Sequence, residues 1–331
     1  MTQVFIFMTN MKRIALLLCA MVFASVMDAQ PNTKLRPDET VLLYADSFQG
    51  NIDPVYGKKM HYAGYKMAEP NGLTGPETML PNGNIGNISD LARVDLYFPE
   101  KPNGQMIIVC PGGGYSIVSS YNEGLYCAAW MLERGITVAV VKYRMPNGHC
   151  KVPHADVENA FRYCRAHAKK WGVDQIGVMG YSAGGHLAAT TSTMWTEEQT
   201  RPDFSVLIYP VITMEQGVTH QCTREKLITK KAEWKEHPVE TYSLENQVTR
   251  FTPPSFLALC SDDFAVPAEN SLRYYNELIN HDVPAEMHIW PTGGHGWGFN
   301  EDKYIGEGKD RFSYAREEYY SVLDAWLKRI R

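Results

Sequence analysis

The chain has 331 residues, of which 44% are hydrophobic and 21% are charged, and its formal net charge is −5. This composition is ordinary for a globular protein, and the length is sufficient to bury one large core. An acidic balance without a basic stripe argues against a nucleic-acid partner.

The first thirty residues are typical of a secretory signal rather than of a folded domain. Lys12 and Arg13 precede an uncharged apolar run at 14–24, and small residues follow it. The run is shorter than the about 20 apolar residues that a membrane-spanning helix needs. We therefore expect residues 1–29 to be removed, with Met11 as the true start. The mature protein is then expected to be secreted or periplasmic, without stable membrane insertion.

Residues 31–90 are rich in Pro, Gly and Asn, and we interpret about 30–90 as an N-terminal arm of loops with one short strand. After this arm, short apolar runs predict strands at 92–98, 105–110, 137–143, 175–180, 204–210, 255–260 and 285–291. The first of these alternates in the manner of an edge strand.

Segments with helical spacing of apolar residues separate these runs. They lie at 122–135, 154–172, 268–282 and about 311–330. Strands that alternate with helices favour an α/β fold, with a parallel sheet covered on both faces. We expect one domain over residues 30–331, with a polar insertion at about 211–250.

The sequence VMGYSAGGHLA at 178–188 places Ser182 between a predicted strand and a helix-like tail. In a tight turn the side chains two residues before and after the serine would crowd each other, so glycines fit positions 180 and 184. This leaves two interpretations of the glycines. In one they serve only to form a tight turn, and in the other they also expose the serine hydroxyl as a nucleophile. A nucleophilic serine needs a base and an orienting acid, which in this topology follow it in the order acid, then His, each after a strand.

Both later positions are filled. Asp262 and Asp263 follow the strand at 255–260, and His295 lies in the loop TGGHGWG after the strand at 285–291. His295 is the predicted base because it sits in a glycine-lined loop after a late strand. Asp263 is preferred as the acid, since DFAVP then leads into the next helix and Asp262 becomes a turn or capping residue.

A glycine-rich loop, PGGGY at 111–115, follows the strand at 105–110. Three glycines let backbone amides approach an oxyanion with no side chain in the way, and the amide of Ala183 directly after the serine adds a donor. The alternative is a plain glycine-rich turn. The order of the four parts at strand ends favours an oxyanion hole.

The segments CPGGGY, GVMGYSAGGHLA, SDDFAVPAENS and GGHGWG resemble the α/β-hydrolase superfamily. More narrowly, they resemble secreted bacterial carbohydrate esterases of the acetylxylan esterase and feruloyl esterase type. The resemblance runs from about residue 90 to the end and implies an α/β-hydrolase fold. Carried over to this sequence, it implies the triad Ser182, Asp263 and His295, with oxyanion donors from Gly113, Gly114 and Ala183. Pro111 departs from related lipases, which often carry His there, so a side-chain support for the loop is in doubt.

The expected activity is that of a serine esterase without a metal or an organic cofactor. An acetyl ester on a plant polysaccharide ranks first as the substrate, and a feruloyl ester second. Tyr115 and Trp297 are expected to contact the substrate, and Tyr121 and Trp195 to lie near the site. A peptidase of the prolyl oligopeptidase kind would use the same triad, but the arm is too short for a gating propeller. A non-catalytic binding protein on this scaffold would usually lack a triad member.

The cysteines give no metal-binding spacing. Cys19 would leave with the signal, and lipidation there is disfavoured by Leu18. Four others fall in apolar patterns and are expected to be buried: Cys110, Cys127, Cys164 and Cys260. A disulfide between Cys150 and Cys222, both in loop-like stretches, stays open.

Overall fold

The computed structural model describes residues 35–45, 52–53, 57–80, 83–228, 237–298 and 313–331. The predicted signal at 1–29 lies outside these residues, as does the 229–236 part of the insertion. Every helix within the described ranges is too short or too polar to span a bilayer.

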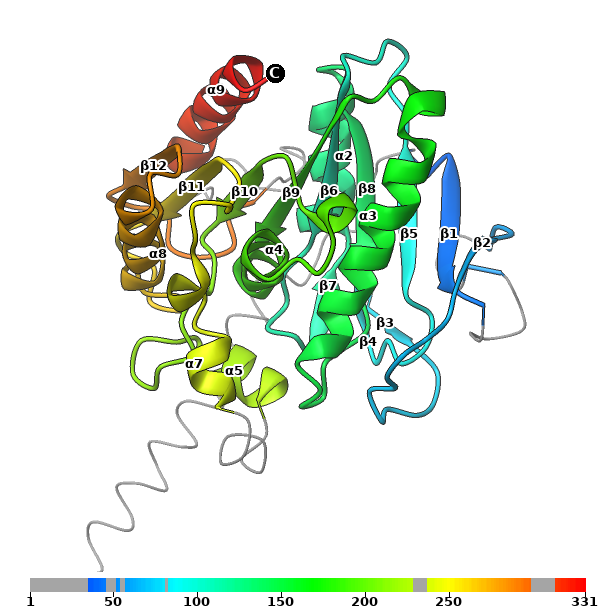
Figure 1. Ribbon diagram of the computed structural model, residues 1–331, viewed down its shortest axis with the longest axis horizontal. Helices are drawn as coiled ribbons and strands as arrows, with labels where there is room; N and C mark the ends of the chain where they lie inside the picture. Colours follow the sequence, from blue (N-terminus) through cyan, green and yellow to red (C-terminus); the bar gives the residue numbers. More distant parts are fainter. Residues whose placement is uncertain (1–34, 46–51, 54–56, 81–82, 229–236, 299–312) are drawn as a thin grey trace, which may run out of the picture.

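A nine-stranded sheet forms the centre of the protein (Figure 1). Its strands are β1 (Glu39–Tyr44), β2 (His61–Tyr65), β5 (Arg93–Tyr97), β6 (Gln105–Cys110), β8 (Thr137–Lys142), β9 (Gln175–Tyr181), β10 (Ser205–Ile208), β11 (Ser255–Cys260) and β12 (Ala285–Trp290). Their order is β12-β11-β10-β9-β6-β8-β5-β1-β2. The run from β12 to β8 is parallel, whereas β5 is antiparallel to both of its neighbours.

Helices cover both faces of this sheet, which confirms the predicted α/β class. Figure 1 shows α3 (Lys151–Trp171), α4 (Ser182–Thr193) and α8 (Glu269–Asn280) on one face. On the other face lie α2 (Tyr126–Leu132) and α9 (Ser313–Arg329). The short helices are the π-helical turn η1 (Tyr121–Leu125), η2 (Glu198–Thr200), α5 (Gln221–Leu227), α7 (Pro238–Thr241) and η3 (Leu244–Gln247).

The core consists of two apolar clusters separated by the sheet. Along β6 the side chains alternate between them: Ile108 packs in the cluster under α3 and α4, and Val109 in the cluster under α2 and α9. This alternation follows from the two-residue period of a strand. A strand buried on both faces is apolar throughout, and for that reason QMIIVC was recognisable in the sequence.

The segment predicted as an edge strand is an interior strand. β5 lies between β8 and β1, and all five of its residues are buried. Its alternation comes from charged side chains that are paired rather than exposed. Arg93 contacts Asp53 and Glu77, while Asp95 contacts Lys142 and accepts a hydrogen bond from Thr40.

The N-terminal arm holds more regular structure than the one short strand expected. β1 and β2 extend the central sheet beyond β5. β3 (Thr78–Met79) and β4 (Asn84–Gly86) form a separate antiparallel sheet with β7 (Ile117–Ser119), which follows the glycine-rich loop. The arm's turn-rich composition concealed these strands, and β3 and β4 contain only two and three residues.

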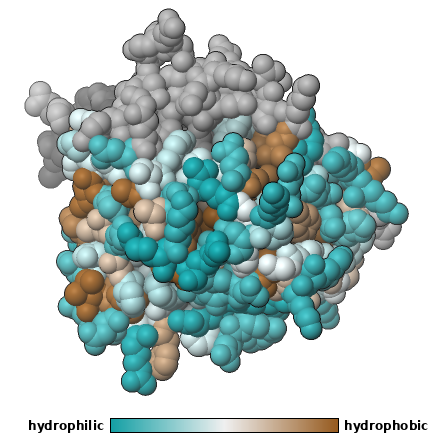
Figure 2. Space-filling model, turned by 90° about the horizontal axis from the view of Figure 1, so that it is seen from above, coloured by the Kyte–Doolittle hydropathy of each residue, from teal (hydrophilic) through white to brown (hydrophobic). Residues whose placement is uncertain are grey.

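The surface seen from above in Figure 2 is mostly hydrophilic over the described residues, with apolar side chains scattered between the polar ones.

The six cysteines within the described ranges form no disulfide, so Cys150 and Cys222 are not bonded to each other. The four expected to be buried are buried.

Candidate active site

Ser182 stands at the junction of β9 and α4, where a strand turns directly into a helix. Tyr181 is extended, whereas Ser182 has a φ of 53°, in the left-handed region. Such a conformation costs a non-glycine residue on the order of 1–3 kcal/mol and persists where the surrounding structure enforces it. The turn presents the hydroxyl at the carboxyl end of the sheet, ahead of the first turn of α4.

The two glycines that flank Ser182 are required by close approach of the backbone. A Cβ at Gly180 would overlap with the carbonyl of Gly184, and a Cβ at Gly184 would overlap with the carbonyl of Cys110. Because those contacts are with backbone atoms, no side-chain movement relieves them. The spacing GxSxG is therefore required because the turn is so sharp that only glycine fits at positions 180 and 184.

The structure brings Ser182, Asp263 and His295 together, although they lie far apart in sequence. His295 Nε2 is 2.8 Å from Ser182 Oγ, and His295 Nδ1 is 2.7 Å from Asp263 Oδ2. With an ionised carboxylate, Nδ1–H donates to Asp263, and the unprotonated Nε2 accepts from the serine hydroxyl. This tautomer is the one a general base needs.

The loops that carry the acid and the base are held by hydrogen bonds from carboxylates to backbone amides. Asp263 Oδ1 accepts from the amides of Ala265 and Val266, at 2.9 Å each, so its second oxygen is turned to His295. Asp262, expected as a turn or capping residue, lies in a turn and also holds the loop of the base. Its carboxylate accepts from the amide of Gly294 at 2.7 Å and from that of Gly293 at 3.3 Å, just before His295.

The three amides expected to form an oxyanion hole are available for a ligand. Within the described residues, the amides of Gly113, Gly114 and Ala183 have no hydrogen-bond partner. Gly112, in contrast, is fixed on both sides: its carbonyl accepts from Ser119 at 2.9 Å and its amide donates to Glu123 at 2.7 Å. Unpaired amides beside a serine are the donors that stabilise a developing oxyanion.

The aromatic residues predicted to contact the substrate require correction. Tyr115 and Trp297 are 1% and 0% exposed, so neither lines a surface that a substrate could reach. The backbone of Tyr115 has a φ of 56°, and its hydroxyl contacts Nδ1 of His186. Trp297 packs in the cluster under α9.

Of the two residues expected near the site, Trp195 lies away from it, whereas Tyr121 begins η1, two residues before Glu123, whose carboxylate contacts Gly112 of the glycine-rich loop. Tyr121 occupies the space that a side chain at Gly83 would need. Trp195 follows α4, a helix that begins at Ser182 and extends about 18 Å. His186 is fully buried, and its Nε2 contacts the carbonyl of Tyr242.

Glu123 beneath the oxyanion loop was not singled out by the sequence. One of its oxygens accepts from Gly112, and the other accepts from the hydroxyl of Tyr209 at 2.8 Å. Burial raises the pKa of Glu123, while its hydrogen bonds and the charge of His295 act in the opposite direction. The residues Asn-Glu-Gly carry no recognisable signal of this role.

His220 in the insertion was also missed. A Cβ at Gly114 would lie 3.6 Å from Cε1 of His220, and Nδ1 of His220 is 2.8 Å from Thr223 Oγ1. Burial and, to a smaller extent, the charge of His295 together lower the pKa of His220 to about 4. The insertion therefore borders the site with a histidine that is neutral at ordinary pH.

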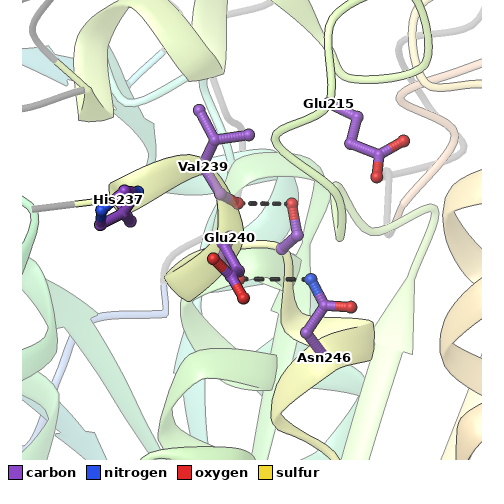
Figure 3. A pocket seen from close by; sticks show the side chains of 6 residues that line it. Glu215, His237, Val239, Glu240 and Asn246 are labelled. Atoms are coloured by element: carbon purple, nitrogen blue, oxygen red, sulfur yellow. Dashed lines mark hydrogen bonds between the residues drawn. The ribbon is translucent and has the colours of Figure 1, made fainter. Parts of the chain in front are cut away.

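A pocket of about 250 Å³ lies elsewhere in the insertion (Figure 3). Its lining residues include Glu215, His237, Glu240 and Asn246, and none of the triad residues. The hydrogen bonds drawn there, such as that from Asn246 to the carbonyl of Glu240, hold the turns of the insertion. The described residues hold no cluster of three or more His, Cys, Asp or Glu side chains suited to a metal.

Comparison with known proteins assigns the chain to a family. Residues 94–278, which run from β5 into α8, match the BD-FAE family. The chain belongs to this family. The match covers the serine turn, the glycine-rich loop and the acid at position 263, and it ends before the loop of His295.

Curated relatives and a solved structure agree with this assignment. The acetylxylan esterase of Xylanibacter ruminicola is 38% identical over 250 residues, which are 74% of this chain and 50% of that protein. The endo-1,4-beta-xylanase B of Butyrivibrio fibrisolvens is 31% identical over 228 residues, 64% of this chain and 35% of that protein. The chain thus spans half the length, or less, of these two relatives.

The crystal structure of an acetyl ester-xyloside bifunctional hydrolase from Caldicellulosiruptor lactoaceticus superimposes with a TM-score of 0.60 at 32% identity. The alignment covers 72% of this chain and 88% of that one. The α/β-hydrolase fold and the resemblance to carbohydrate esterases of the acetylxylan esterase type, both expected from the sequence, are confirmed by these comparisons.

Proposed function

We propose that this BD-FAE protein hydrolyses carboxylic esters of carbohydrates through an acyl intermediate on Ser182. The observation that carries the proposal is the chain of contacts from Ser182 Oγ to His295 Nε2 and from His295 Nδ1 to Asp263. The relatives named for acetylxylan and acetyl ester-xyloside hydrolysis support the substrate class.

The reaction follows from the roles of these atoms. His295 Nε2 takes the proton of Ser182 as Oγ attacks the ester carbonyl, and Asp263 stabilises the resulting imidazolium. The amides of Gly113, Gly114 and Ala183 hold the oxyanion. His295 then protonates the leaving sugar alcohol. In the second half, water loses a proton to His295 as its oxygen attacks the acyl carbon; His295 then returns the proton to Ser182 Oγ as the carboxylic acid leaves, which restores the hydroxyl and the neutral imidazole.

Replacement of the nucleophile tests this mechanism. Ser182→Ala is expected to lower turnover of p-nitrophenyl acetate at least about a thousandfold, because the residues of a triad act as a unit. The far-ultraviolet circular dichroism spectrum should be unchanged. Retention of more than a tenth of wild-type turnover by a folded variant would contradict the assignment.

The proposed substrate is an acetyl ester of xylan or of a related polysaccharide. The alternative within the same chemistry is a feruloyl ester. Incubation with acetylated and with feruloylated xylan oligosaccharides, followed by identification of the released acid, distinguishes them. A proline peptide substrate serves as the third arm, because cleavage of it in preference to both esters would favour a peptidase.

Export of the protein is part of the proposal. The basic residues before the apolar run at 14–24 support a signal that directs the chain out of the cytoplasm. An extracellular or periplasmic location places the enzyme where polysaccharide fragments occur. N-terminal sequencing of the protein recovered from its host tests this: a mature chain that begins near residue 30 is expected, and one that begins at Met11 would argue against export by this signal.

A further inference from the structure

Glu123 is a buried carboxylate that the triad does not use. Its side chain lies in the π-helical turn η1, directly beneath the oxyanion loop, and the residue is 4% exposed. No Lys or Arg in the described part of the chain forms an ion pair with it. Burial of a carboxylate without a basic partner costs several kcal/mol, so such a group needs strong hydrogen bonds to be retained.

The first of those bonds fixes the oxyanion loop. Oε2 of Glu123 accepts from the amide of Gly112, while the carbonyl of Gly112 accepts from Ser119. The peptide unit between Gly112 and Gly113 is planar and trans, so its N–H points away from its carbonyl oxygen. With the carbonyl held by Ser119, the amide of Gly113 is directed to the opposite side and is left unpaired.

There is also no room for another residue at this point of the loop. A Cβ at Gly112 would lie 2.8 Å from Oε2 of Glu123 and 3.0 Å from the Cβ of Ser182. The carboxylate and the nucleophile therefore contact the same glycine from two directions. A shift of Glu123 would move the loop relative to Ser182.

The second oxygen of Glu123 reaches the loop of the base. Tyr209, which follows β10, donates its hydroxyl hydrogen to Oε1 and accepts from the amide of Gly298 at 3.0 Å. The ring of Tyr209 packs against the imidazole of His295, with 4.7 Å between ring centroids. One carboxylate thus joins the oxyanion loop to the segment that carries His295.

We propose that Glu123 is a positioning residue for ester hydrolysis. Through Gly112 and Tyr209, it fixes the position of the glycine-rich loop at 111–115 relative to the loop that carries His295. The inference rests on the proposed function. Glu123 touches neither the substrate nor the reacting atoms, and it gains and loses no proton during turnover. Its negative charge also favours the imidazolium that His295 becomes when the tetrahedral intermediate forms.

The test compares Glu123→Gln with wild type and with Glu158→Gln. Glu158 is a matched control because it is a buried carboxylate of α3 that accepts hydrogen bonds from Thr196 and Thr200, away from the triad. Glu123→Gln keeps the shape but loses the charge and one acceptor. We expect kcat for p-nitrophenyl acetate to fall by about 10- to 100-fold, the size of effect of lost support around a reacting group, with KM within about twofold.

The pH profile gives a readout that a purely structural role would not move. Asp263, His220, Glu123 and the phenol of Tyr209 are the ionisable groups that face His295. Loss of the Glu123 charge disfavours the imidazolium, so the acid limb of kcat/KM should move to lower pH in Glu123→Gln and stay in place in Glu158→Gln. Wild-type kcat together with an unmoved acid limb in a folded Glu123→Gln protein would overturn the proposal.

A second variant covers the case in which Glu123→Gln does not fold. Tyr209→Phe keeps the ring but removes the hydroxyl that joins Glu123 to Gly298, and it should lower kcat about 5- to 10-fold with little effect on KM. Wild-type kcat in this variant would also overturn the proposal.

The rate of labelling of Ser182 by a fluorophosphonate separates this inference from the proposed function. If the wild type is labelled but hydrolyses no tested ester, the substrate assignment fails. Slower labelling of Glu123→Gln then still supports the positioning role, and equal labelling overturns it. If the wild type is neither labelled nor active, both proposals fail.

Discussion

Ser182 and Tyr115 share a left-handed backbone conformation, with opposite consequences for their side chains. At Ser182 it presents the hydroxyl to His295, whereas at Tyr115 it accompanies a ring that is buried against His186. The sequence motif located both residues beside the site but could not give the side on which Tyr115 would lie. The direction of a side chain in a glycine-rich loop depends on the φ of its residue. The types of the neighbouring residues do not determine the φ of a non-glycine residue.

The sequence does not single out Glu123, and it indicates only a turn or capping role for Asp262, for a related reason. The partners of Glu123 lie at positions 112 and 209, and those of Asp262 at 293 and 294, so each role appears only after folding. The triad was accessible because its three members follow separate strands in a fixed order. Residues that support a site from beneath obey no such order.

The anchoring role of Asp262 gives a prediction at the residue scale. Asp262→Ala removes the acceptor for two amides directly before His295, so the base should lose its fixed position. We expect kcat to fall about tenfold and the free energy of unfolding to fall by about 1 kcal/mol, the net value of such hydrogen bonds. Steady-state kinetics and urea unfolding measure the two quantities. Asp324→Ala on α9 is the surface control, and a kcat for Asp262→Ala equal to that of this control would contradict the anchoring role.

At the scale of elements, the main strands could be predicted because most of their apolar runs are buried on both faces, and the main helices because their apolar residues recur with helical spacing. The boundaries agree to within a few residues, as for the strand predicted at 105–110 and observed as β6. The strands of the arm were harder to predict, since β3 and β4 contain only two and three residues. The environment of β5 was misjudged because charges in an alternating strand indicate solvent unless their partners are known.

Helix α4 carries a buried histidine whose ionisation makes stability depend on pH. Burial lowers the pKa of His186 from its usual 6.5 to about 4. Because the unfolded chain binds the proton more readily, this contribution to stability is complete above about pH 6.5 and is lost as the pH falls toward 4. Between pH 7 and pH 4.5 it amounts to about 2–3 kcal/mol of unfolding free energy.

Urea unfolding at these two pH values measures the contribution. His186→Gln cannot ionise and keeps a side chain that can donate to Tyr242, so it should lose less stability on acidification than wild type. The difference isolates His186, because His154 and His220, whose pKa values are also lowered, are present in both proteins. Equal losses in the two proteins would show that His186 does not contribute.

At the scale of the whole molecule, buried ion pairs connect the N-terminal arm to the sheet. Arg93 of β5 is fully buried between Asp53 and Glu77, both of which belong to the arm. Removal of one partner leaves part of a buried charge uncompensated. Glu77→Ala should therefore lower the free energy of unfolding by about 3–5 kcal/mol, while kcat at temperatures well below unfolding stays at its wild-type value.

Denaturant unfolding with an exposed pair as the control tests this. Glu269 contacts Arg273 on the surface of α8, and Glu269→Ala should cost less than about 1 kcal/mol. A loss for Glu77→Ala no larger than that of the control would mean that Asp53 alone compensates Arg93.

The position of β1 beside β5 bears on how the chain can be shortened. The family match begins at residue 94, inside β5, and so omits β1 as well as Arg93 and the carboxylates that neutralise it. A fragment cut at that point would retain the serine and the glycine-rich loop, yet it would expose a bare row of peptide groups along an interior strand. Such a row pairs readily with other chains. The arm thus keeps the buried, charged strand β5 away from the edge of the sheet, which ends at β2 instead.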